Sequence, residues 1–317
     1  MIATVPNFDL DAAQHQALNN YANNMLSLPN LNPNTVPDGV KDVINLYQNC
    51  HNTALNWQHN VEPMTINGAK SLNDYAKSSL TITDAMITAS NLLQTADQAT
   101  REQIAEHLTQ MLGTLFDTAA ANQTITTNIL AALKPLVNEI GGELTLSQNV
   151  QVEMQKLMAS AAASESQLPM IQNSINSTQD QINQLSKPWE FWKWDQYFKD
   201  LFNLKSNLEN LSNEYNTLNS LVNQINMIHA FVGQQQAIVN GISSSSQLVL
   251  TNWEQMQGSW TLLSQEISAI RTGVLGLKGV TPTSEGWSAI ANWKELFNIA
   301  MWTTIEQDSA KMLTTTI

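Results

Sequence analysis

Two long segments of this chain carry apolar residues in alternating steps of four and three. The spaced positions of the first segment are Val150, Met154, Leu157, Ala161, Ser164, Leu168, Ile171, Ile175, Thr178, Ile182 and Leu185. In the second segment, ten of the eleven residues found at every seventh position from 204 to 274 are apolar. A period of 3.5 residues is typical of a coiled-coil seam, so the pattern predicts two long helices that pair along these stripes.

The two expected helices are too long to be enclosed in a compact globule. At a rise of 1.5 Å per residue, a helix over 150–185 is roughly 50 Å long, and an unbroken helix over 201–277 is roughly 115 Å long. Because only a short segment joins them, we expect the chain to reverse there and return. The sequence therefore predicts an all-α fold, an elongated helical bundle with very long antiparallel coiled-coil helices and a short aromatic head at the hairpin tip.

The pattern divides this single elongated domain into five segments. They are the N-terminal helices of a tail bundle over 1–149, an outgoing long helix over 150–187, the tip over 188–202, a return long helix over 203–280 and a C-terminal tail helix over 281–317. One stripe of the return helix keeps the seam spacing and is interpreted as bundle core. Its residues are Trp253, Met256, Trp260, Leu263, Ile267 and Ile270. The apolar face of the tail helix is formed by Trp287, Ile290, Trp293, Phe297, Ala300 and Met301.

Three residues before the outgoing helix weaken helical structure. Pro135 lacks a backbone N–H and predicts a kink. Gly141 and Gly142 form a pair with high backbone freedom and predict a break or a hinge. We therefore take Pro135, Gly141 and Gly142 as candidate hinge residues.

Seven of the chain's twenty-one aromatic residues lie between Trp189 and Phe202, where the two long helices meet. Trp and Tyr favour the membrane–water interface because each ring is apolar with one polar edge. The candidate membrane-binding residues are Trp189, Phe191, Trp192, Trp194, Tyr197, Phe198 and Phe202. The alternative is a hydrophobic turn that packs against another chain or folds back on the body, since apolar patches also mark protein partners.

The charge of the chain limits its partners. The formal net charge is −13, and only 13% of the residues are charged. Binding to nucleic acid needs clustered Lys and Arg, so a nucleic-acid partner is not expected. Binding driven by anionic lipid is disfavoured for the same reason, and any membrane contact should be aromatic and hydrophobic. No apolar run approaches the roughly 20 residues needed to span a bilayer, so we expect a water-soluble protein.

No pattern of reactive side chains indicates catalysis, a metal or a cofactor. The spacing of Gly273, Gly276 and Gly279 does not match a phosphate-binding loop. His51 and His59 lie two turns apart on one expected helix, too far to bind one metal ion together. The pair Glu106-His107 is interpreted as a solvated face, and the single cysteine, Cys50, as a buried structural thiol.

The first nine residues show no basic n-region or apolar h-region, so no classical cleaved signal is visible.

Two stretches resemble the α-helical pore-forming toxins of the cytolysin A family, which includes haemolysin BL, the non-haemolytic enterotoxins and related insecticidal proteins. The first contains Leu46-Tyr47-Gln48-Asn49-Cys50, Trp57, Asn60, Pro63, Ala69 and Tyr75. The second runs from Met256 to Ile267 as Met-Gln-Gly-Ser-Trp-Thr-Leu-Leu-Ser-Gln-Glu-Ile, and a Trp-containing last helix follows. The resemblance covers roughly residues 40 to 310. It implies a five-helix tail bundle and a head, between the two longest helices, whose apolar tongue enters the membrane.

The tip departs from that family pattern. Residues 188–202 replace a longer tongue, and the charged residues among them prevent a span of roughly 30 Å of hydrocarbon. The resemblance thus implies one component of a multi-component pore-forming toxin, expected to be tripartite, with a target-cell membrane and other helical toxin components as partners. We expect a secreted protein that hides the tip in a soluble homo-oligomer before it reaches the membrane. The alternatives are a non-toxic coiled-coil scaffold whose tip binds a protein and, ranked far below, an enzyme built in a helix bundle.

Overall fold

The computed structural model describes residues 7–8, 10–31, 36, 41–93, 95–185, 193–279, 284–296 and 298–314. Within these ranges all regular secondary structure is helical and no strand occurs. The expectation of an all-α fold is therefore confirmed.

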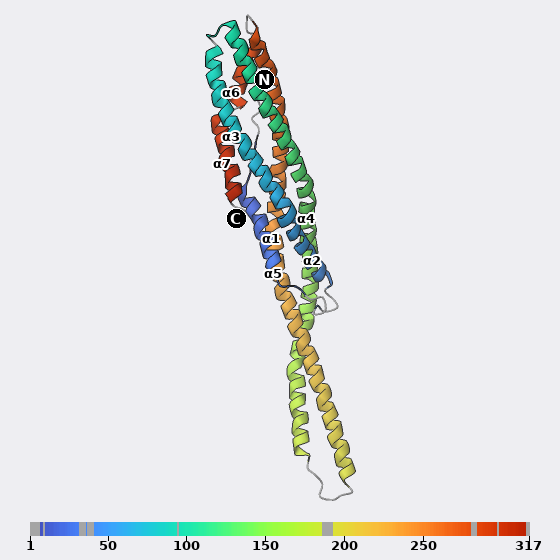
Figure 1. Cartoon of the computed structure of the whole chain (residues 1–317). Coiled ribbons are helices and arrows are strands. Elements are labelled where there is room, and N and C mark those ends of the chain that lie inside the picture. The colour runs from blue at the N-terminus through green and yellow to red at the C-terminus, as the bar shows by residue number, and fades with distance from the viewer. Residues whose placement is uncertain are drawn as a thin grey trace. The chain divides into compact units, whose positions relative to one another are not determined.

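Two very long helices dominate the chain (Figure 1). The helices in order are α1 (Ala12–Ser27), α2 (Lys41–Asn56), the π-helical turn η2 (Trp57–Val61), α3 (Glu62–Leu93), α4 (Gln98–Gln184), α5 (Trp194–Leu275), the short 3-10 turn η4 (Gly276–Lys278), α6 (Ser284–Leu296) and α7 (Ile299–Thr314). With 87 residues, α4 is roughly 130 Å long at 1.5 Å per residue.

The chain forms two compact units, each built from several segments. The bundle unit contains Met1–Ser27, Cys50–Gly142 and Asn240–Ile317. The hairpin unit contains Leu28–Asn49 and Glu143–Val239. Both α4 and α5 pass from one unit into the other, and in α4 the division falls directly after Gly142.

Aromatic side chains fill the core of the bundle unit. Trp253 and Trp260, interpreted from the sequence as bundle core, are each 1% exposed, which confirms that interpretation. Other large side chains buried to the same degree are Trp57, Trp293, Trp302 and Tyr75. The ring of Tyr75 meets that of Trp260 edge to face, with centroids 5.0 Å apart. Burial of this much aromatic surface supplies a large share of the hydrophobic stabilisation of the unit.

Side-chain hydrogen bonds join α3 to α7 within the bundle unit. Asn73 is buried on α3, and its Nδ2 donates to the backbone oxygen of Glu306 at 2.8 Å and to Ser309 Oγ at 3.1 Å. These two bonds satisfy a buried amide that would otherwise destabilise the fold.

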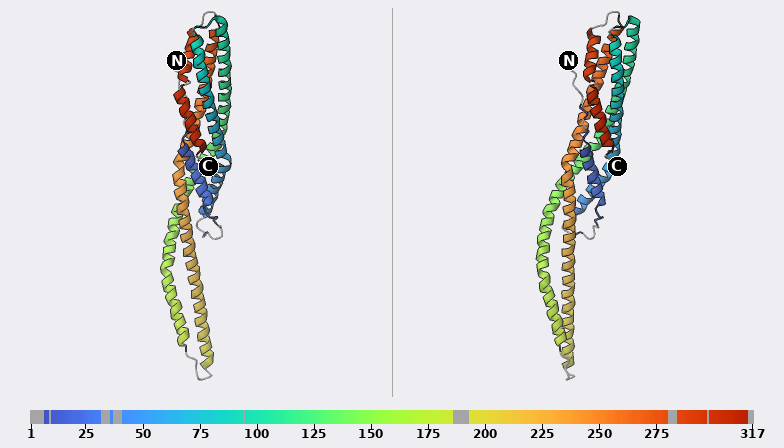
Figure 2. Two further views of the ribbon diagram at one scale, coloured as in Figure 1. Left: turned by 60° about the vertical axis from the view of Figure 1, so that its left-hand side comes forward. Right: turned by 90° about the vertical axis from the view of Figure 1, so that its left-hand side faces the viewer.

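The hairpin unit is built on the antiparallel pairing of α4 and α5 (Figures 1 and 2). The side chain of Gln236 on α5 donates to the backbone oxygen of Ser147 on α4 at 3.0 Å. Every seam position expected between 150 and 185 is buried or half-buried, as is every seventh residue from 204 to 274. The heptad pattern therefore predicted correctly which face of each long helix is covered.

A polar layer interrupts the apolar seam of the hairpin unit. Glu143 and Ser147 on α4 and Gln235 on α5 are all at most 2% exposed. No described group hydrogen-bonds to either amide atom of Gln235. A buried polar group without a partner costs free energy, so this layer weakens the pairing locally.

The helices between Lys41 and Leu93 follow one another without a loop, although Pro63 lies among them. The turn η2 has π geometry, and the N–H of Glu62 bonds to the oxygen of Trp57, five residues back. A proline ring clashes with the carbonyl four residues before it in a regular α-helix. The wider π turn accommodates Pro63 and lets the helix continue.

The C-terminal segment forms two helices where the sequence predicted one. Asn298 starts α7, since its side-chain oxygen accepts a hydrogen bond from the N–H of Ala300 at 2.9 Å. Its backbone oxygen accepts from the N–H of Trp302 at 3.1 Å. Asparagine is a favoured N-cap residue, and this cap separates α6 from α7.

Candidate functional site

The predicted tip is divided between the described part of α5 and residues outside it. Trp189, Phe191 and Trp192 lie outside the described residues. Trp194, Tyr197, Phe198 and Phe202 belong to the first three turns of α5, so the helix begins earlier than the sequence predicted. The spacing of four between Trp194, Phe198 and Phe202 is the signal that could have identified this part of the helix from the sequence.

Three aromatic rings of the first turn form a cluster. The ring centroids of Trp194 and Tyr197 are 5.7 Å apart. Phe198 lies 5.5 Å from each of them, and its ring meets that of Tyr197 edge to face. Such tilted and edge-to-face contacts are favourable aromatic geometries, and they hold the three rings together as one apolar surface.

The apolar surface continues one turn further and faces outward. Phe198 is 55% exposed and Phe202 is 73% exposed, whereas Leu201 and Leu204, on the seam side, are half-buried. At 100° per residue, Trp194, Phe198 and Phe202 lie within an arc of about 80° on the helix surface. We call these three residues and Tyr197 the aromatic stripe.

Charged and amide side chains occupy the other positions of these turns. Lys199 Nζ lies 2.8 Å from a carboxylate oxygen of Asp195, one turn earlier. This hydrogen bond and the charge of Asp195 raise the pKa of Lys199 above its usual range. Gln196 Nε2 donates to Asp200 at 2.7 Å. The start of α5 is therefore amphipathic, with one aromatic side and a polar side on which Lys199 pairs with Asp195.

The candidate hinge residues all lie inside α4, which shows no break. Pro135, Gly141 and Gly142 are exposed. A β-carbon placed on either glycine would meet nothing within 4 Å. The expected helix break at Gly141-Gly142 is therefore absent, and their role as a hinge stays a prediction.

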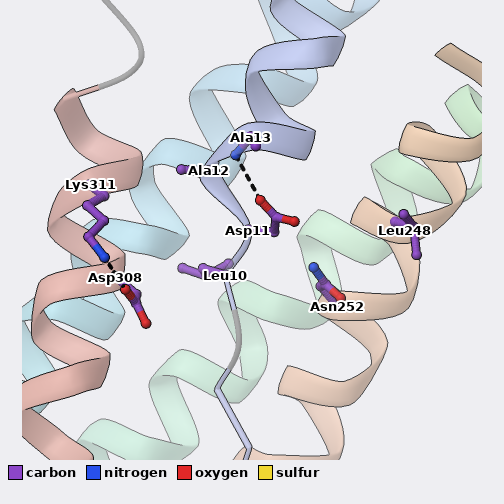
Figure 3. A pocket seen from close by; sticks show the side chains of 8 residues that line it. All are labelled: Leu10, Asp11, Ala12, Ala13, Leu248, Asn252, Asp308 and Lys311. Atoms are coloured by element: carbon purple, nitrogen blue, oxygen red, sulfur yellow. Dashed lines mark hydrogen bonds and ion pairs between the residues drawn. The ribbon is translucent and has the colours of Figure 1, made fainter. Parts of the chain in front are cut away.

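A hollow of about 370 Å³ lies in the bundle unit, where α1 begins beside α5 and α7 (Figure 3). The N–H of Ala13 donates to Asp11 Oδ1 at 2.9 Å, which caps α1. Lys311 Nζ donates to Asp308 at 2.8 Å. The charged side chains that line this hollow thus form hydrogen bonds with other groups of the protein. Among the described residues, no group of three or more His, Cys, Asp or Glu side chains is arranged to hold a metal ion.

None of the described helices is long and apolar enough to cross a membrane.

The fold is similar to that of several solved proteins. XaxA from Xenorhabdus nematophila aligns over 96% of this chain and 95% of its own, with 14% identity and a TM-score of 0.56. The AhlB pore of the tripartite α-pore-forming toxin AHL from Aeromonas hydrophila aligns over 95% and 93%, with 12% identity and a TM-score of 0.57. The SmhB pore of the tripartite α-pore-forming toxin Smh from Serratia marcescens aligns over 96% of both chains, with 14% identity and a TM-score of 0.55. At these identities, the likeness establishes the fold.

Sequence comparison adds no closer relationship, since no family model and no curated protein matches the chain.

Proposed function

We propose that this chain is a component of a multi-component α-helical pore-forming toxin. It docks to a target-cell membrane through its short aromatic tip and assembles there with other helical components into a pore. The observation that carries the proposal is the aromatic stripe at the start of α5, in which Trp194 and Tyr197 are half-buried and Phe198 and Phe202 are exposed. The fold that this hairpin belongs to is also that of the AhlB and SmhB pores, which supports the assignment.

The proposed membrane contact consists of seven aromatic side chains. They are Trp189, Phe191, Trp192, Trp194, Tyr197, Phe198 and Phe202. Charge does not drive the contact, because the chain has a net charge of −13 and Lys199 is paired with Asp195. The rings insert at the level of the lipid headgroups, and neutral lipids suffice for binding.

We further propose that the protein is secreted and that soluble copies conceal their tips before they meet a membrane. An aromatic side chain buries about 150–250 Å² on association, so several together exceed the apolar patch that soluble monomers normally expose. A homo-oligomer in which the tips pack together removes this surface from water. On contact with a membrane, the aromatic tips exchange their contacts with each other for contacts with lipid.

Assembly into a pore requires a change of shape, and we propose Pro135, Gly141 and Gly142 as the hinge residues. The two glycines are the last two residues of the bundle unit in α4. Glycine destabilises a helix interior by roughly 0.5–1 kcal/mol relative to alanine. A β-carbon placed on either glycine would meet nothing within 4 Å, so close packing against another helix does not explain why glycine stands at these two positions.

The second candidate function is a coiled-coil scaffold whose aromatic tip binds a protein. The tilted packing of Trp194 with Tyr197 and Phe198 favours it, since rigid aromatic groups are also typical anchors of protein interfaces. This candidate predicts no affinity for lipid alone.

Flotation with protein-free phosphatidylcholine vesicles distinguishes the two candidates. We expect the parent protein to float and the double variant Phe198→Ser/Phe202→Ser to stay at the bottom of the gradient. A matched control is Met170→Ser/Met227→Ser, because both methionines are exposed to a similar degree in the same unit but lie away from the tip. If the parent does not float, or if both double variants float equally, the aromatic stripe is not a membrane anchor.

Lysis of erythrocytes tests the multi-component part of the proposal. We expect little lysis by the purified chain alone, because its tip is too short and too charged to span a bilayer. Full lysis by the single chain at low concentration would contradict the role as one component among several.

A further inference from the structure

The described N-terminal residues, 7–8 and 10–27, form an arm that is attached to the bundle unit by a few specific contacts. At its start, the N–H of Asn7 donates to Ser259 Oγ at 3.0 Å, and Ser259 Oγ donates back to the oxygen of Asn7 at 2.6 Å. The ring of Phe8 packs between those of Trp260 and Trp302, at centroid distances of 4.5 and 5.9 Å. These contacts join residues between 252 and 294 positions apart, so the arm covers a surface formed by the C-terminal part of the chain.

His15 is the titratable group at the centre of this attachment. It lies on α1 and is only 1% exposed. Its Nε2 is 2.9 Å from Thr65 Oγ1 on α3, and Thr65 Oγ1 donates its own proton to the oxygen of Glu62 at 2.7 Å. Thr65 can therefore only accept from the imidazole, which assigns the proton of the neutral ring to Nε2.

The other ring nitrogen of His15 is left as a buried lone pair. No described group hydrogen-bonds to Nδ1. The indole of Trp57 covers the ring at a centroid distance of 5.1 Å, and Trp57 Nε1 donates to Asn19 Oδ1 at 2.7 Å. Protonation of His15 would place a positive charge and a new N–H donor at a position where no described group accepts a hydrogen bond. Burial accordingly lowers the pKa of His15 from 6.5 to about 4.

Among the charged groups of the elements that surround α1, Glu62 is linked to the arm by a side-chain hydrogen bond. It is half-buried on α3 and bonds to Asn19 of α1, and burial raises its pKa above its usual range. Other titratable groups of these elements include Asp11 at the start of the arm, His51 on α2, His59 in η2, and the paired Asp308 and Lys311 on α7. None of these carboxylates hydrogen-bonds to either nitrogen of His15.

We propose that the arm is an acid-released latch and that protonation of His15 at Nδ1 releases it. The proposal does not depend on a role in toxin assembly. Release exposes two surfaces: the apolar side of α1, and the aromatic socket of Trp260 and Trp302 that Phe8 fills. Tyr21 of α1 donates to the backbone oxygen of Cys50 at 3.5 Å, so release also removes a contact of the residue that carries the chain's single thiol, which is fully buried.

The direction of the pH effect follows from proton linkage. Because the pKa of His15 is lower in the attached arm than in the free arm, the stabilisation is complete above pH 6.5 and is lost as the pH falls towards 4. Between pH 7.5 and pH 5, the ratio of released to attached arm should rise by about thirtyfold from this group alone. Glu62 acts in the opposite sense, since its raised pKa means that protonation stabilises the attached arm.

Hydrogen exchange of the full chain, read by mass spectrometry and corrected for the intrinsic effect of pH, measures the opening of the arm. We expect the protection of peptides from α1 to fall by about thirtyfold between pH 7.5 and 5, while that of peptides from α4 stays constant. The variant His15→Gln keeps an uncharged donor towards Thr65 and should abolish most of the change. The matched control His107→Gln, an exposed histidine on α4, should behave as the parent does.

Two further measurements test the proposal without relying only on hydrogen exchange in His15→Gln. Labelling of Cys50 with 4,4′-dithiodipyridine, which reacts with thiols in acid, should accelerate at pH 5 in the parent and not in His15→Gln. Glu62→Gln should show a larger acid response than the parent, because the opposing group is removed. The proposal is overturned if the parent and His15→Gln lose protection of α1 equally, or if α3 and α4 lose protection together with α1.

Discussion

Gly68 on α3 lies directly against the indole of Trp253 on α5. A β-carbon on Gly68 would stand 2.5 Å from Cη2 of Trp253 and 2.5 Å from Cδ1 of Ile129 on α4. Both distances are far below van der Waals contact. The absence of a side chain at this position is what lets α3, α4 and α5 pack around the buried Trp253.

Replacement Gly68→Ala should lower the free energy of unfolding by about 1–3 kcal/mol, because the added methyl overpacks the core. Chemical denaturation followed by circular dichroism measures the change. Gly142→Ala is the control, since nothing lies within 4 Å of its β-position and the gain in helix propensity should raise stability by up to about 1 kcal/mol. Equal effects of the two substitutions would contradict the packing argument.

Replacement Asn73→Ala should lower the free energy of unfolding by about 1–3 kcal/mol, because it removes the two hydrogen bonds that a buried amide on α3 donates to α7. Asn67→Ala on the same helix is the matched control, since Asn67 is exposed. Thermal denaturation of both variants against the parent checks the difference. A loss no greater than that of the control would show that the bonds between α3 and α7 contribute little.

Replacement Gln235→Leu should raise the free energy of unfolding by about 1–2 kcal/mol, since it removes the desolvation cost of a buried amide and restores the apolar seam. Hydrogen exchange in the hairpin unit should slow in the same variant. Gln234→Leu, at the neighbouring exposed position, is the control and should change stability little. Destabilisation by Gln235→Leu would indicate that the amide is satisfied.

Asp97 caps the start of α4, where its Oδ1 accepts a hydrogen bond from the N–H of Thr100 at 2.8 Å. This backbone hydrogen bond holds the pKa of the carboxyl below its usual value of 3.8. The cap therefore stabilises the helix above that pH and is lost as the pH falls through the lowered pKa.

We expect Asp97→Ala to speed hydrogen exchange at the first turn of α4 near neutral pH, whereas Asp117→Ala, at an exposed position in mid-helix, should not. Direct titration of the Asp97 carboxyl by NMR should place its pKa below 3.8; a value at or above it would refute the cap.

The periodicity of the chain predicted the fold class and the buried faces of the long helices correctly. Side chains repeat along a helix with a fixed angle, so a stripe of apolar residues specifies which side is covered without knowledge of the partner. For the same reason, Trp253 and Trp260 were identified as core from their spacing alone. Exposure of Glu106 and His107 and burial of Cys50 agree with the sequence-based interpretation as well.

Helix ends were predicted less well, because they depend on hydrogen bonds that several residue types can make. The cap at Asn298 divides the expected tail helix into α6 and α7. The π turn η2 allows the helix to continue through Pro63 without a loop. The aromatic composition of the tip was visible in the sequence. Which rings form a stripe was not, because that depends on α5 beginning at Trp194.

The sequence by itself thus determined the helices, their amphipathic faces and the aromatic tip, since each of these is a local property of neighbouring residues. Only the tertiary structure decided that Gly68 lies against Trp253, that Ser259 hydrogen-bonds to Asn7, and that His15 is buried against Trp57. These contacts join residues that are between 42 and 252 positions apart. A local pattern specifies that a face is buried, but the partner that covers it is selected by how all the helices pack together.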